Sequence, residues 1–163
     1  MKTHKFFALR AWTLVAMFLV TGALVAQTTF RKGAYYNLFP ATDGHQVLEL
    51  DGAKLKFQKM DAAAEGQYWT VTDLSGSVRI INPFTNQALR ADGDRVGVGE
   101  NNGSDEAQLW KYENGLLIPT NSPNYALAKG QGGTLVVIKK ETALTHKAAQ
   151  FRFEESAYAG FDD

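Results

Sequence analysis

Large aromatic residues recur at a fixed long interval in this chain, and that interval limits the folds available to it. Trp69 stands in the stretch GQYWTVT, and Trp110 stands 41 residues later in AQLWKYE. Another 41 residues lead to Phe151 in AQFRFEE. Helices and strands repeat over about 3.6 and 2 residues, so neither produces this spacing, whereas an internal structural repeat does. The chain is therefore predicted to contain three copies of one structural unit.

Each unit contains the pattern of four short strands. The second unit shows it most clearly, with the runs SVRIIN, QALRA, RVGVG and LWKYE separated by the turn PFTN, the hairpin signal DGD and a polar loop. Asp-Gly between alternating apolar runs is a strong hairpin signal. The first unit repeats the order with AYYNLF, QVLEL, KLKFQ and YWTV, and the third with LLIP, YALAK, TLVVIK and FRFE. The predicted repeats one, two and three span about residues 31–71, 72–112 and 113–153.

Three four-stranded units predict an all-β fold, the β-trefoil. Propellers also use four-stranded units, but they close with about four to eight of them. In a trefoil six strands form a short barrel and six form hairpins that cap one end, so closure leaves no exposed sheet edge. We expect Trp69, Trp110 and Phe151 to meet in its core. Matching inward positions are predicted for Leu48, Leu89 and Leu127 on the second strands and for Leu55, Val96 and Leu135 on the third.

The first 26 residues have the pattern of a signal peptide. A basic head, MKTHKFFALR, precedes the apolar run AWTLVAMFLVTGALVA, which ends in small residues. The run is shorter than the roughly 20 residues that a membrane anchor needs, so cleavage after Ala26 and no stable membrane insertion afterwards are expected. The predicted organisation is a signal peptide at 1–26, one trefoil domain at 27–157 and a tail at 158–163. Localisation is expected to be periplasmic or secreted.

Charge and cysteine content exclude several function classes. Removal of residues 1–26 lowers the Lys plus Arg count from 17 to 14 against 17 Asp plus Glu, so the processed chain is weakly acidic. Nucleic acid is therefore a poor candidate for a partner. The chain has no cysteine, which rules out disulfides and thiolate metal sites. Neither His45 nor His146 has a neighbour at metal-ligand spacing, and the acidic residues fall mostly in turns, so we expect no metal, no cofactor and no enzyme activity.

The repeats resemble the ricin-type β-trefoil lectins, whose units of roughly 40 residues end in Gln-x-Trp. Gln67-Tyr68-Trp69 and Gln108-Leu109-Trp110 match that motif, and Ala149-Gln150-Phe151 is a worn copy. The likeness covers the chain from about Tyr35 to Glu154. The resemblance implies that Gln67, Trp69, Gln108, Trp110 and Phe151 are core residues rather than ligand contacts.

The resemblance also implies where sugar would bind. The family places a carboxylate just after the leucine of the second strand and an aromatic platform at the end of the third strand. In repeat one these positions hold Glu49 and Gln58, in repeat two Arg90 and Gly99, and in repeat three Ala128 and about Ile138. Repeat one alone keeps an acid. Because Gln58 is not a platform, Tyr35 or Tyr36 is the candidate for that role.

Two functions stay open at this point. One is an exported lectin-like protein that binds a glycan or polysaccharide through a degenerate site in repeat one. The other is a trefoil that has lost sugar binding and binds another exported protein as an inhibitor or assembly partner.

Overall fold

The computed structural model describes residues 28–158, a part of the chain built from twelve short strands. The predicted signal peptide and the tail beyond Tyr158 lie outside the described residues. The strands are β1 (Tyr36–Pro40), β2 (Gln46–Asp51), β3 (Lys54–Lys59), β4 (Thr70–Asp73), β5 (Val78–Asn82), β6 (Gln87–Asp92), β7 (Arg95–Glu100), β8 (Trp110–Glu113), β9 (Leu116–Pro119), β10 (Tyr125–Lys129), β11 (Leu135–Lys139) and β12 (Phe151–Glu155). Each predicted repeat therefore supplies four strands.

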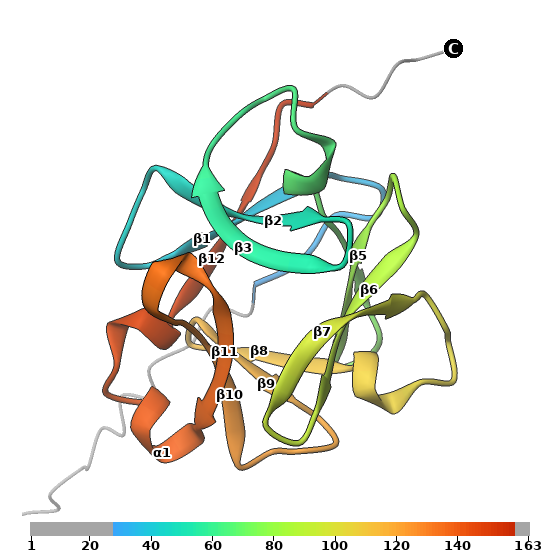
Figure 1. The fold of residues 1–163 in the computed structure, drawn as a ribbon. Coiled ribbons are helices and arrows are strands. Elements are labelled where there is room, and N and C mark those ends of the chain that lie inside the picture. The colour runs from blue at the N-terminus through green and yellow to red at the C-terminus, as the bar shows by residue number, and fades with distance from the viewer. Residues whose placement is uncertain (1–27, 159–163) are drawn as a thin grey trace, which may run out of the picture.

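Six of the strands close into a barrel. Antiparallel ladders join β12 to β1, β4 to β5, β5 to β8 and β8 to β9. A bridge between Tyr36 and Trp69 connects β1 to β4, and the Phe151 N–H donates to the Gly115 carbonyl beside β9. The other six strands form the hairpins β2–β3, β6–β7 and β10–β11, which surround the centre of the molecule in Figure 1. The fold is the predicted β-trefoil.

The core lies where the three repeats meet. Trp69 and Trp110 are both 0% exposed and Phe151 is 2% exposed. Trp69 Nε1 donates to the Leu48 carbonyl at 3.1 Å, and Trp110 Nε1 donates to the Leu89 carbonyl at 2.9 Å. The two indoles therefore make the same contact in their own repeats. Each contributes about 2–3 kcal/mol by apolar burial, and its polar N–H is satisfied.

Short helical turns connect the third strand of each repeat to the fourth. They are η1 (Glu65–Gln67), η2 (Glu106–Gln108) and η4 (Lys147–Ala149), and a further turn, η3 (Gln131–Gly133), lies inside the third hairpin. Repeat three also contains α1 (Lys140–Ala143), which follows β11 directly. Sequence periodicity did not predict α1, because four residues are too few to show a helical period. Within residues 28–158 no helix has the length and apolar character of a membrane span.

Candidate functional site

Glu49 lies in the middle of β2, and a buried amide holds its carboxylate in place. Its neighbours Leu48 and Leu50 point into the core, while Glu49 itself is only partly buried. Gln67 Nε2 donates to Glu49 Oε2 at 2.6 Å, and Gln67 is 1% exposed. A buried donor of this kind fixes the acceptor before any ligand arrives. Glu49 is therefore a pre-oriented acceptor at the protein surface.

The Gln67 amide is itself fully engaged. Its Nε2 also donates to the Lys59 carbonyl at 3.0 Å, and its Oε1 accepts from the Asp61 N–H at 2.8 Å. The Asp61 donor determines which end of the amide is the oxygen, since an N–H cannot donate to the NH₂ group. Gln67 thus ties the end of β3 and the following loop to Glu49. The sequence identified Gln67 as a core residue, and its contact with Glu49 was not predicted.

Gly66 explains how η1 reaches the carboxylate. A Cβ atom built on Gly66 would lie 2.2 Å from the Leu50 carbonyl oxygen and 3.4 Å from Glu49 Cγ. Only glycine allows the backbone to approach β2 this closely. The close approach positions the neighbouring Gln67 beside Glu49.

Lys56 and Gln58 lie on the same face of the first hairpin as Glu49. Glu49 pairs directly with Lys56, and Gln58 follows two residues along β3 opposite Val47. Side chains opposite each other on an antiparallel pair are close neighbours. The structure thus brings together Glu49, Gln58 and Gln67. Glu49, Lys56 and Gln58 are called the repeat-one site below.

The two candidate tyrosines lie in other clusters. Tyr36 is 6% exposed, packs edge-on against Phe30 and accepts a hydrogen bond from the Arg31 N–H at 2.7 Å. Its ring therefore offers no open face to a sugar. Tyr35 is half-buried and stacks on Phe84 with ring centroids 6.1 Å apart. Tyr68 and Tyr158 complete this aromatic cluster, which no described contact joins to Glu49.

The matching place in repeat two is a polar hollow of about 450 Å³ lined by Arg90, Gly99, Glu100, Asn101, Asn102, Asp105 and Gln108. Gln108 repeats the role of Gln67, donating to the Glu100 carbonyl at 2.7 Å and accepting from the Asn102 N–H at 3.0 Å. Arg90 replaces the acid and pairs with Asp105 at 3.5 Å. The Cδ atom of Arg90 would lie 2.9 Å from a Cβ built on Gly99, so the aliphatic part of the arginine side chain covers the platform position.

The matching place in repeat three is filled. The β10–β11 register sets Ile138 opposite Ala126, as Gln58 stands opposite Val47, so Ile138 occupies the platform position. Ala143 of α1 is 0% exposed and belongs to one apolar cluster with Ala128 and Ala149. The helix therefore covers this position with apolar side chains, which offer no hydrogen bonds to a sugar.

Within residues 28–158, no group of three or more His, Cys, Asp or Glu side chains is arranged to hold a metal ion. His45 and His146 are both exposed.

Solved structures share this fold at low sequence identity. The Clostridium perfringens endo-β-galactosidase that releases GlcNAcα1-4Gal matches over 76% of this chain and 32% of its own, at 14% identity and a TM-score of 0.64. The Polyporus squamosus lectin, bound to Neu5Acα2-6Galβ1-4GlcNAc, matches over 78% of this chain and 50% of its own, at 14% identity and a TM-score of 0.64. The C-terminal half of an earthworm R-type lectin, in complex with GalNAc, matches over 76% of this chain and 99% of its own, at 15% identity and a TM-score of 0.55.

This chain thus spans about a third of the galactosidase, half of the fungal lectin and nearly all of the earthworm lectin half. No protein-family model matches the sequence, and no curated protein matches it. At these identities the likeness concerns the fold alone. The chain folds as a β-trefoil of the kind found in R-type lectins.

Proposed function

We propose that this protein is an exported, non-enzymatic lectin-like trefoil that binds glycans through the repeat-one site. The observation that carries the proposal is the 2.6 Å hydrogen bond from buried Gln67 to Glu49. A carboxylate held in this way is ready to accept hydrogen bonds from neighbouring sugar hydroxyls. The residue just after the second-strand leucine is arginine in repeat two and alanine in repeat three.

The site supplies both halves of a hydroxyl-binding arrangement. Glu49 Oε2 accepts from Gln67, so Oε1 and the remaining lone pairs stay available to hydroxyl donors. Hydrogen bonds to a charged carboxylate are about twice as strong as neutral ones. Lys56 and Gln58, on the same face of the hairpin, are placed to donate to ring or hydroxyl oxygens. Neutral, hydrated ligands need such directed contacts in order to leave water.

The fold neighbours support the proposal. The Polyporus lectin and the earthworm lectin are both solved with a glycan bound. We carry over glycan binding as a class and not any one of these ligands.

Binding through this site is expected to be weak. Gln58 stands where an aromatic platform would lie, and Tyr36 has no open face. A shallow polar site of this kind corresponds to a Kd of about 0.1–1 mM, so a multivalent glycan array is the suitable screen. Glu49→Gln keeps the shape and removes the charge. It should weaken binding of an array hit by about 1–3 kcal/mol in titration calorimetry.

Arg90→Ala and Ala128→Ser are the matched controls, since they change the equivalent positions of the other repeats. Both should leave binding of the same glycan unchanged. Loss of binding in Arg90→Ala with none in Glu49→Gln would move the site to repeat two. A broad array with no hit would contradict the proposal.

One observation favours the alternative of a protein-binding trefoil. Phe84, in the turn after β5, is 38% exposed and stacks on Tyr35 in the aromatic cluster. Exposed aromatic groups of this kind are enriched at protein interfaces. If the array is negative, retention of an exported partner by the protein but not by its Phe84→Ser variant would support this second function.

Export belongs to the same proposal and rests on the sequence of residues 1–26 alone. The exported form should begin at or near Gln27, because Ala26 offers the small residue that signal peptidase requires. Intact-mass measurement of the exported protein tests this. A product that still carries Met1 would contradict it.

A further inference from the structure

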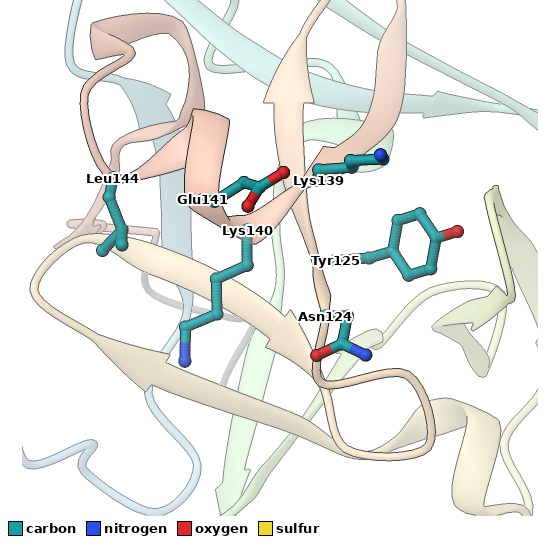
Figure 2. A pocket seen from close by; sticks show the side chains of 6 residues that line it. All are labelled: Asn124, Tyr125, Lys139, Lys140, Glu141 and Leu144. Carbon is teal, nitrogen blue, oxygen red and sulfur yellow. The ribbon is translucent and has the colours of Figure 1, made fainter.

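A hollow in repeat three contains an aromatic ring, an amide and charged groups that the repeat-one site does not use. It has a volume of about 560 Å³ and is lined by Asn124, Tyr125, Lys139, Lys140, Glu141 and Leu144 (Figure 2). That volume lies within the range of about 300–1,000 Å³ typical of small-ligand sites. The hollow lies at the outer end of the β10–β11 hairpin, where β10 begins and β11 ends.

The helix α1 builds one wall of this hollow. The Lys140 N–H donates to the Asn124 carbonyl at 2.8 Å, which fastens the start of α1 to the residue before β10. In repeat one the Met60 N–H makes the equivalent bond to the His45 carbonyl, but the chain there continues as a loop. Ala143 anchors α1 from beneath at 0% exposure. On its inner side α1 therefore packs against Ala128. On its outer side it contributes Lys140 and Glu141 to the hollow.

Tyr125 provides the ring. It is partly buried and pairs with Lys139 across the β10–β11 ladder. Figure 2 shows Asn124 and Lys139 on either side of the Tyr125 ring, with Lys140 and Leu144 toward the other end of the hollow. A ring flanked by an amide and an ammonium group matches a ligand with a flat C–H face, hydroxyls and a negative charge.

The charges favour an anion. Lys139 and Lys140 oppose the single carboxylate of Glu141. Within residues 28–158, none of these three side chains forms an ion pair. The ammonium groups are therefore available to a ligand. Leu144, 60% exposed, adds an apolar contact at the far rim.

We propose that this hollow binds a sugar residue that carries a carboxylate, such as a hexuronic acid unit of an acidic glycan. The Tyr125 ring supports the C–H face of the sugar, Lys139 binds the carboxylate, and Asn124 and Glu141 bind hydroxyls. The hollow shares no residue with the repeat-one site, so the proposal holds whether or not Glu49 binds a glycan.

The test compares two sugars that differ only at C6, galacturonic acid and galactose, by NMR titration of the ¹⁵N-labelled protein. Galacturonic acid should shift amides of residues 124–127 and 138–144 and bind about fivefold more tightly than galactose in low salt. The difference should shrink as salt is added, because exposed charges are screened. Equal binding of the two sugars, or shifts confined to other residues, would overturn the proposal.

Variants assign the roles. Lys139→Gln should remove the preference for galacturonic acid, and Tyr125→Ala should weaken both sugars severalfold, while Tyr125→Phe should bind both normally. Lys111→Gln, an exposed lysine on β8, is the charge-matched control and should change nothing. Glu49→Gln should leave the galacturonic acid shifts at residues 124–127 and 138–144 unchanged, so failure of the repeat-one site and failure of this one are distinguishable. Full competition by a short oligoglutamate peptide would show a general anion surface and overturn the sugar assignment.

Discussion

The two tryptophans show how much a single side chain carries in this protein. Each indole is fully buried and donates its N–H to a carbonyl of the second strand of its own repeat. Trp110→Ala should therefore lower the free energy of unfolding by about 3–5 kcal/mol, and Trp69→Ala by a similar amount, through the cavity and the orphaned carbonyl. Urea unfolding measures this. Met60→Ala, at a site 47% exposed, is the control. A tryptophan variant with the same free energy of unfolding as this control would contradict a structural role.

Ionisation of Tyr112 is expected to lower the stability of the folded protein at alkaline pH. Desolvation by burial raises the pKa of its phenol above the ordinary value of 10.0, and its hydroxyl donates to the Phe151 carbonyl at 2.9 Å. A raised folded pKa means that the unfolded chain ionises first, so the contribution is complete below about pH 10 and is lost as pH rises through the folded pKa. Tyr112→Phe should cost about 1 kcal/mol at pH 7 and should flatten the fall in melting temperature above pH 10. A fall as steep as that of the parent protein would refute this assignment.

The turn η1 links the core to the surface of repeat one. Gly66→Ala would place a methyl group 2.2 Å from the Leu50 carbonyl oxygen, so η1 must move away from β2 and carry Gln67 with it. The expected cost is about 1–3 kcal/mol of stability, together with weaker glycan binding because Glu49 loses its donor. Gly103→Ala is the matched control, since a Cβ there meets nothing within 4 Å. Equal stability of the two variants in thermal melts would show that the close approach does not matter.

The fold could be predicted from the sequence better than the sites could. The equal spacing of Trp69, Trp110 and Phe151 indicates a repeated core, because few other residue types fill such buried positions. The contact between Gln67 and Glu49 joins residues 18 positions apart, and no short-range pattern marks it. The hollow beside Tyr125 depends on α1, whose four residues carry no period. Tyr36 and Tyr35 look alike in sequence, and only the tertiary packing separates the buried ring of Tyr36, the first residue of β1, from the half-buried ring of Tyr35 just before it.

The whole trefoil depends on pairing between the two ends of the described chain. β1 and β12 form a five-pair antiparallel ladder from Tyr36↔Glu155 to Pro40↔Phe151. A circular permutant that joins these strands by a short linker and opens the exposed turn at Gly76, between β4 and β5, should fold with cooperative melting. Deletion of Phe151–Glu155 should abolish folding, because it leaves two barrel edges open. A deletion variant with native circular dichroism would contradict this dependence.

The β1–β12 ladder joins the first strand to be synthesised with the last. A ribosome delivers Tyr36 first and Phe151 115 residues later, which takes roughly 6 to 23 s at about 5–20 residues per second. Throughout that interval β1 lacks the partner that it has in the finished barrel. An unpaired strand edge invites pairing with another chain. The nascent chain is therefore more open to pairing with other chains before its last strand has emerged than after the barrel has closed.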